Sequence, residues 1–309
     1  MAAEAREHSD GRAGRGVNRN RHRTIGAGRS RRDRTAPFRQ QMVIDFHTHF
    51  YPDKVAEKAI AFCSQKIGFF ADGTRSGLEE SMRRAGINLA VGLPVVNTPA
   101  NSANINAWAA RENHPPILML GGIHPDEPDP LKTLDAIAAA GLPGIKVHPE
   151  YQQFRFDEER LFPVWEKCEK LGLIVVTHAG WDAMYEPPYH SDPESLAKFH
   201  RRFPGLRLVL AHLGGMAMWD AVEKYLAGME VYLDLAMVAR EYITPEQLTR
   251  IIRAHGAEKI LFGTDSPWYD QKKQLEFIRS LPLSPSEQER IFFRNAAELL
   301  KLDLPGDGQ

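Results

Sequence analysis

The sequence is poor in cysteine and contains no long apolar run. Only Cys63 and Cys168 occur among its 309 residues, far apart in helix-like segments, which argues against a disulfide framework. No stretch of about 18 consecutive apolar residues is present, so we expect no membrane-spanning helix. These absences favour a soluble protein of a reducing compartment, and we expect a cytoplasmic location.

Lysine, tyrosine and tryptophan are missing from the first 40 residues. In this segment eleven arginines stand against four acidic residues, which gives a charge of +7 and leaves −8 for the rest of the chain. A segment rich in arginine and glycine, with almost no apolar residues for a core, is typical of disorder. We therefore predict that residues 1–41 form a disordered arm.

Three origins of this arm are considered. A nucleic-acid-binding arm would need lysine or stacking aromatic residues, and the acidic remainder of the chain offers no supporting surface. A targeting peptide would need an apolar region and few acidic residues. Met42 stands immediately before the first apolar strand. We therefore favour a start codon assigned upstream of the true one.

From Met42 onward, strand-like runs alternate with helix-like runs. The strand-like runs are rich in Val, Ile and Leu, as expected for strands buried on both faces, and their starts recur at roughly 25 to 45 residues, the spacing of a βα unit. The predicted strands are Met42–His49, Asn88–Val96, Ile117–His124, Gly144–Pro149, Leu173–Ala179, Leu206–His212, Glu230–Ala236 and Lys259–Asp265.

The helix-like runs begin and end with recognisable capping residues. Asp192 and Thr244 each precede a proline, the pattern of an N-cap followed by a first-turn proline, and Gly86 and Gly256 end helical runs. A last helix is predicted from Ser284 to about Leu302. Eight strands alternating with eight helices predict a single (β/α)8 barrel of the TIM type over residues 42–303, followed by a polar tail at 304–309.

In such a barrel the active site lies at the carboxyl ends of the strands. The first strand ends in His47-Thr48-His49, and because side chains alternate along a strand, His47 and His49 share a face with Asp45. Two imidazoles on one face can bind a divalent cation. Later strands also end in side chains that can bind a metal or transfer a proton, namely His124, Lys146, His148, His178, His212 and Asp265.

Taken together, these strand ends resemble the amidohydrolase superfamily, more narrowly the branch that contains aminocarboxymuconate semialdehyde decarboxylase and related metal-dependent hydrolases. The resemblance covers about residues 42 to 302. It rests on the segments Ile44–His49, Gly144–Pro149, Ala211–Gly215, Leu261–Trp268 and Asn295-Ala296.

The resemblance implies roles for five residues. His47, His49 and His178 would supply nitrogen ligands to one divalent metal, which we expect to be Zn²⁺, and Asp265 would be both oxygen ligand and general base. A carboxylate at the end of an apolar strand also needs a partner to offset its desolvation, and a cation provides one. His212 would lie across the mouth and position the metal-bound water or polarise the scissile group.

Lys146 allows several interpretations. In binuclear members of the superfamily a lysine on the fourth strand is carboxylated and bridges two metals, whereas the decarboxylase-like branch needs one metal and no bridge. Without carboxylation, Lys146 could pair with Asp45 or hold a substrate carboxylate. We favour one metal per chain.

The expected function is a metal-dependent hydrolase that acts on a small organic or aromatic carboxylate through a metal-activated water. The alternative is a non-oxidative decarboxylase that uses the same metal site. A non-catalytic barrel is disfavoured because the whole ligand set is present. The expected partner is a small-molecule substrate, without nucleic acid or membrane, and a homodimer is left open. Substrate contacts are assigned to Lys146, His148, His124, Arg155, Trp181 and Trp268, with Tyr151 and Arg240 as further candidates.

Overall fold

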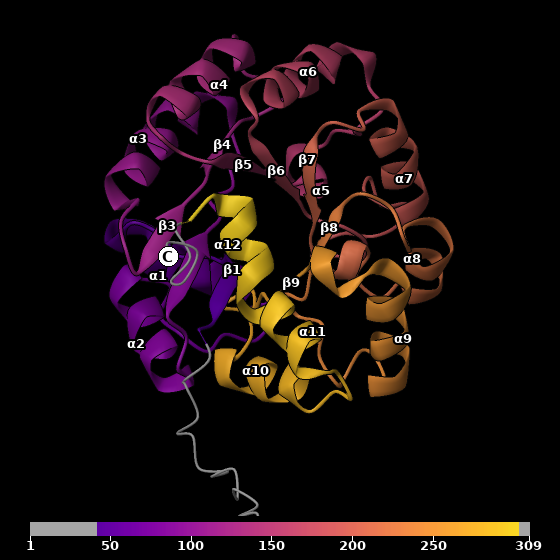
Figure 1. Cartoon of the computed structure of the whole chain (residues 1–309). Helices are drawn as coiled ribbons and strands as arrows, with labels where there is room; N and C mark the ends of the chain where they lie inside the picture. The colour runs from indigo at the N-terminus through magenta and orange to yellow at the C-terminus, as the bar shows by residue number, and fades with distance from the viewer. Residues whose placement is uncertain (1–41, 303–309) are drawn as a thin grey trace, which may run out of the picture. The chain divides into compact units, whose positions relative to one another are not determined.

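The computed structural model describes residues 42–302 (Figure 1), which belong to one compact unit. The predicted arm at residues 1–41 and the predicted tail at 304–309 lie outside the described residues, so both stay predictions.

Within residues 42–302, nine short strands form two sheets, one of the first three strands and one of the last six, paired in chain order and always parallel. Each predicted strand contains at least one of them. The strands are β1 (Ile44–Thr48), β2 (Leu89–Gly92), β3 (Ile117–Met119), β4 (Gly121–Gly122), β5 (Gly144–Val147), β6 (Ile174–Thr177), β7 (Arg207–Leu210), β8 (Tyr232–Asp234) and β9 (Ile260–Leu261).

The third predicted strand is divided into β3 and β4. The division falls at Leu120, and β4 ends at Gly122, where the Asn106 side chain accepts from the Gly122 N–H at 2.8 Å and donates to its carbonyl at 2.8 Å. These two hydrogen bonds take backbone groups that a continuous strand would use for pairing. Leu120 N–H still donates to Gly92 O at 3.0 Å, so the sheet continues across the division.

The sheet closes on itself between the first and last strands. Phe46 N–H donates to Phe262 O at 2.8 Å, and Asp265 N–H donates to His47 O at 2.8 Å. Beside them, the carboxylate of Asp45 accepts hydrogen bonds from the Thr264 hydroxyl at 2.6 Å and from Gln271 Nε2 at 2.7 Å. The predicted (β/α)8 barrel is thereby confirmed.

Helices surround the barrel (Figure 1), and several begin and end where the sequence predicts. Thr244 caps one helix by accepting from Gln247 N–H, and Gly86 ends another with a φ of 74°. The α-helices are α1 (Asp53–Cys63), α2 (Arg75–Ala85), α3 (Ser102–Glu112), α4 (Pro130–Ala139), α5 (Pro149–Gln152), α6 (Phe162–Leu171), α7 (Pro193–Arg202), α8 (Trp219–Tyr225), α9 (Pro245–His255), α10 (Gln271–Arg279), α11 (Pro285–Glu289) and α12 (Asn295–Leu300).

Shorter helical turns complete the layer. They are η1 (Pro99–Asn101), η2 (Glu159–Leu161), η3 (His212–Gly214), η4 (Ala257–Lys259) and the π-helical η5 (Arg290–Arg294). The last predicted helix is therefore three consecutive pieces, because η5 interrupts the α-helical hydrogen bonding between α11 and α12.

One end of the barrel is closed by α12, which lies across it in Figure 1. Ala296, Leu299 and Leu300 of α12 pack in one buried cluster with Phe46 of β1 and Val176 of β6. A second, larger cluster lies between the strands and the surrounding helices. The closed end leaves the carboxyl ends of the strands as the open end of the barrel.

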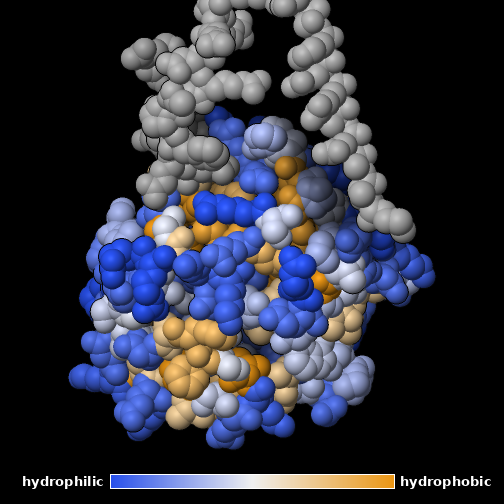
Figure 2. All heavy atoms as spheres, turned by 90° about the horizontal axis from the view of Figure 1, so that it is seen from below, coloured by the Kyte–Doolittle hydropathy of each residue, from blue (hydrophilic) through white to orange (hydrophobic). Residues whose placement is uncertain are grey.

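Hydrophilic residues dominate the face shown in Figure 2, with smaller hydrophobic areas between them. Within residues 42–302, none of the helices is both long enough and apolar enough to cross a membrane.

Candidate metal centre

A cavity of about 940 Å³ opens at the carboxyl ends of the strands. Seven of the predicted site residues that line it stand at or shortly after a strand end: His47, His49, Lys146, His148, His178, His212 and Asp265. The barrel therefore brings together, in one cavity, groups that are separated by more than 200 positions in the chain.

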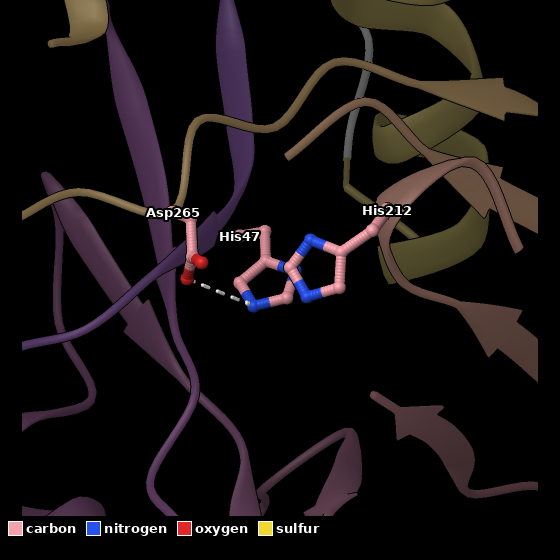
Figure 3. A group of neighbouring side chains, drawn as sticks. All are labelled: His47, His212 and Asp265. Carbon is pink, nitrogen blue, oxygen red and sulfur yellow. Dashed lines mark ion pairs between the residues drawn. The ribbon is translucent and has the colours of Figure 1, made fainter. Parts of the chain in front are cut away.

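Three predicted ligand atoms converge at the closure of the barrel. His47 Nε2 lies 3.2 Å from His49 Nε2, and Asp265 Oδ1 lies 3.0 Å from His49 Nε2 and 3.4 Å from His47 Nε2. Figure 3 shows His47 between Asp265 and His212. Asp45, which we expected on the same face, is held by Thr264 and Gln271 instead, since the pairing register of β1 shifts between Asp45 and Thr48.

The outer nitrogens of these histidines are bound by oxygen atoms. His47 Nδ1 lies 2.7 Å from Asp234 Oδ2, His49 Nδ1 lies 2.7 Å from Leu93 O, and His212 Nδ1 lies 2.9 Å from Ala236 O. An oxygen acceptor places the imidazole proton on Nδ1 and leaves Nε2 with a free lone pair. Burial, aided by the Lys146 ammonium, also lowers the pKa of His47 well below its usual value, which keeps the ring neutral.

The donor set fits a cation. The facing Nε2 atoms of His47 and His49 are both acceptors, so they repel each other at 3.2 Å unless a positive charge lies beside them. Asp265 Oδ1 and His178 Nε2 are buried, and neither forms a hydrogen bond with any described residue. Burial raises the pKa of Asp265, but His47 and His49 outweigh it and hold the pKa below its usual value, so the carboxylate stays ionised. Neutral imidazoles and an ionised carboxylate are the ligands that a divalent metal requires.

His178 and His212 lie side by side, and the His212 ring is 5.3 Å from that of His47. His212 Nε2 is 3.1 Å from His178 Nδ1, and the two rings are 4.9 Å apart at 62°. His212 also lies with His47 and Asp265 in a group whose ligand atoms are all within 4.8 Å of one another, while His178 is grouped with His148 and Asp182. Both histidines are therefore near enough to contact a bound metal. The assignment of His178 as a ligand and His212 as a catalytic residue remains our prediction.

The backbone is strained at both predicted catalytic residues. Asp265 has a φ of 66° and His212 a φ of 55°, in the left-handed region that side chains with a Cβ rarely adopt. Strain of this kind clusters at functional sites, where the surrounding structure holds a side chain in a required direction.

Comparison with known proteins agrees with this geometry. The amidohydrolase family model matches residues 44–302. The chain belongs to the amidohydrolase family, a family of enzymes.

Individual relatives of this chain are distant. A 2-amino-3-carboxymuconate-6-semialdehyde decarboxylase of Dictyostelium discoideum is 28% identical over 200 residues, which cover 54% of this chain and 55% of the relative. The matched part thus spans about half the length of that curated relative. The predicted resemblance to this branch is confirmed.

Two solved structures share the fold. A 5-carboxyvanillate decarboxylase from Sphingomonas paucimobilis matches with a TM-score of 0.67 and 15% identity, over 85% of this chain and 100% of that one. A 5-carboxyvanillate decarboxylase from Novosphingobium aromaticivorans, complexed with manganese and 4-hydroxy-3-methoxy-5-nitrobenzoic acid, matches with a TM-score of 0.66 and 15% identity, over 85% and 97% of the two chains.

Lys146 points into the candidate metal centre. Its side chain is buried, and Nζ lies 3.5 Å from His47 Nε2. Burial lowers the pKa of Lys146 to about 8, opposed by the carboxylates of Asp234 and Asp265. The interpretation that pairs Lys146 with Asp45 does not hold, because Asp45 binds Thr264 and Gln271.

The residues assigned to substrate binding divide into two groups. His148, Tyr151, Trp181 and Trp268 line the cavity, with the Tyr151 ring stacked 4.0 Å from that of His148. The other predicted residues lie outside its lining: His124, Arg155 and Arg240.

The contacts of those three residues explain their placement. His124 Nδ1 accepts from Asp126 N–H at 3.1 Å in a turn. Arg155 pairs with Asp157 at 3.4 Å, and Arg240 lies over the Phe277 ring. Local charge and ring contacts thus hold these side chains away from the cavity, which argues against direct substrate contact.

Two acidic residues of the site are absent from the sequence-based prediction. Asp234 ends β8 and contacts two of the histidines. Its Oδ2 lies 2.7 Å from His47 Nδ1, and its Oδ1 accepts a hydrogen bond from the backbone N–H of His212 at 3.0 Å. Asp182 lines the cavity and lies 3.4 Å from His148 Nε2. A carboxylate at the end of an apolar strand, as in Leu233-Asp234-Leu235, could have revealed the first. An acid four residues after His178 was the available signal for the second.

Proposed function

We propose that this amidohydrolase family member is a metal-dependent decarboxylase that removes a carboxylate from a small, planar organic acid. One observation carries the proposal: the named relatives, one matching over 54% of this chain and two over 85%, are decarboxylases. The cavity also contains the donor set that a divalent metal requires. This reverses the order of our sequence-based interpretation, in which hydrolysis came first.

His47, His49, His178 and Asp265 would hold the cation. When bound, it would supply a Lewis acid for a substrate oxygen and lower the pKa of a coordinated water. Three imidazoles and one carboxylate favour Zn²⁺, and a related structure contains manganese, so metal analysis of the purified protein identifies the ion. One cation per chain is proposed.

The protein's own residues would manage a proton. Decarboxylation breaks the bond between the carboxylate and its carbon, the electron pair stays on that carbon, and one proton must be added there as carbon dioxide leaves. Asp265 and His212, which lie beside His47 with their ligand atoms within 4.8 Å of each other, are placed to hold and deliver this proton. Lys146, mostly an ammonium at neutral pH, would orient the substrate carboxylate.

The aromatic lining favours a planar substrate. Tyr51, Trp108, Trp181 and Trp268 line the cavity with Phe50, and large aromatic side chains contact flat rings over a wide area. These side chains would also exclude water from the carbon that receives the proton.

Hydrolysis is the second candidate, supported by the family match and by the same metal and proton-transfer groups. The metal-loaded protein should be incubated with aromatic and unsaturated carboxylic acids, and separately with lactones and amides. Carbon dioxide released with the decarboxylated product, and lost in Asp265→Asn, is the expected result. Cleavage of lactones or amides without carbon dioxide would contradict decarboxylation and support hydrolysis.

A further inference from the structure

Asp182 carries a carboxylate that the proposed reaction does not use. It lies in the segment after β6 and lines the cavity, although it is only 9% exposed. One oxygen, Oδ1, accepts a hydrogen bond from Met184 N–H at 2.7 Å. Among residues 42–302 the other oxygen, Oδ2, receives no hydrogen bond, and His148 Nε2 lies 3.4 Å from it.

The direction of the His148 proton follows from its second nitrogen. His148 Nδ1 accepts from Tyr151 N–H at 3.4 Å, which leaves the proton of the neutral ring on Nε2. Stacking fixes the ring, since Tyr151 lies 4.0 Å from it at 27° and His178 lies 4.3 Å from it at 15°. His148 Nε2 therefore carries the proton on the side of Asp182, and the 3.4 Å contact with Asp182 Oδ2 does not have hydrogen-bond geometry.

The charges around Asp182 limit what it can bind. Its Oδ2 lies 4.0 Å from His178 Nε2, which also lacks a hydrogen-bond partner, and Asp265 lies in the same cavity. A substrate carboxylate would be repelled by Asp182 and belongs near Lys146 and the metal ligands. A neutral donor such as a hydroxyl or amino group would satisfy the free oxygen.

We propose that Asp182, oriented by His148, is a specificity-determining residue that selects acids carrying a hydroxyl or amino substituent near the carboxylate. The inference rests on the proposed function, because it assumes that a planar acid occupies this cavity. The free Oδ2 would accept the substituent's proton, and His148 Nε2–H would donate to the substituent's lone pair.

The hydrogen bond from Met184 makes one substitution especially informative. In Asp182→Asn, Met184 N–H keeps the amide oxygen at the position of Oδ1, so the amide NH₂ takes the position of Oδ2. The variant thus presents a donor where the native protein presents an acceptor. Asp182→Ala presents neither, and Glu186→Gln removes an exposed acid of the same segment as the matched control.

The experiment measures binding to the metal-loaded protein by calorimetry. The probes are benzoate and its amino, methyl and methoxy derivatives at ring positions 2 and 3, where amino and methyl groups match in size. The native protein and Glu186→Gln should bind the better aminobenzoate at least about tenfold more tightly than the matching methylbenzoate, as expected for one hydrogen bond to a carboxylate. Asp182→Ala should lose this preference, and Asp182→Asn should instead prefer the methoxy derivative.

The outcomes separate this inference from the proposed function. If amino and methyl derivatives bind equally, or if the preference persists in Asp182→Ala, the inference is wrong while the cavity still binds planar acids. If benzoate and all its derivatives fail to bind, the proposed function fails with it. Metal content should be unchanged in Asp182→Asn, and a loss of metal would make Asp182 a metal ligand and overturn the assignment.

Discussion

His47 Nδ1 lies 2.7 Å from Asp234 Oδ2, and both side chains are almost completely buried. The other oxygen of Asp234 accepts from the backbone N–H groups of His212 and Ala236, each at 3.0 Å. One carboxylate thus fixes the orientation of His47 and the backbone position of His212. Asp234 connects the proposed metal centre to the proposed proton-transfer group.

Asp234→Asn should weaken metal binding. The two backbone N–H groups would hold the amide oxygen, so the amide NH₂ would face His47 Nδ1 and force the imidazole proton onto Nε2, where it blocks metal ligation. We expect a loss of about 10- to 100-fold in metal affinity, the usual effect of removing such a partner. Competition with a chelator measures the metal affinity, and Asp220→Asn on the exposed face of α8 is the control. Equal metal affinities of Asp234→Asn and the native protein would contradict the predicted tautomer of His47.

Asp265→Asn should leave the barrel folded and remove most turnover. The amide can still contact a cation weakly, but it cannot hold the proton that the reaction transfers. Thermal unfolding monitored by circular dichroism checks the fold, and product formation checks activity. Turnover at the native level in this variant would show that Asp265 is not the proton carrier.

His212→Ala tests the division of roles between the two neighbouring histidines. If His178 is the third nitrogen ligand, the variant should keep its metal and lose turnover by about 10²- to 10⁴-fold, the contribution of a typical general acid or base. Elemental analysis together with steady-state kinetics distinguishes the outcomes. A metal-free His212→Ala protein would place His212 among the ligands, as its distance grouping with His47 and Asp265 also allows.

Lys146 determines whether one or two metals bind. With a pKa lowered to about 8, Lys146 loses its proton as the pH rises through 8, and about nine in ten side chains remain ammonium at pH 7. An ammonium near His47 Nε2 disfavours a second cation, because one unit pair at about 4 Å and an effective dielectric of about 20 is worth about 4 kcal/mol.

We therefore expect one metal per chain, no effect of bicarbonate during reconstitution at pH 7, and retained metal in Lys146→Met. Reconstitution at pH 9, where most Lys146 side chains are neutral amines, is the sharper condition, since only a neutral amine can be carboxylated. Two metals per chain that fall to one in Lys146→Met would contradict the mononuclear prediction.

The barrel and its strand ends could be predicted from the sequence because the βα period and the position of strand-end polar residues depend on local pattern. The convergence of His47, His49 and Asp265 follows from barrel closure, which a closed eight-stranded topology implies. Arg155 shows the limit of this reasoning. Its position after a strand suggested the cavity, but a nearby acid, Asp157, pairs with it outside.

The sequence can mark Asp234 as a strand-end carboxylate, but it cannot show which imidazole Asp234 binds. Which oxygen binds an outer imidazole nitrogen depends on the register of neighbouring strands, and the register of β1 shifts just where the histidines stand. The same shift turns Asp45 toward Thr264 and Gln271. Alternation along a regular strand cannot anticipate such an irregularity.

Closure of the sheet between β1 and β9 also determines when, during synthesis and folding, the metal ligands can come together. The residues that close it, Asp45 and Thr264, are 219 positions apart, and the proposed ligands His47 and Asp265 come from the same two edges. During synthesis the first histidines leave the ribosome long before Asp265 exists, so the full ligand set cannot form on an incomplete chain. Capture of the metal would then mark the end of folding, and the ion would bind selectively to chains whose barrel has already closed.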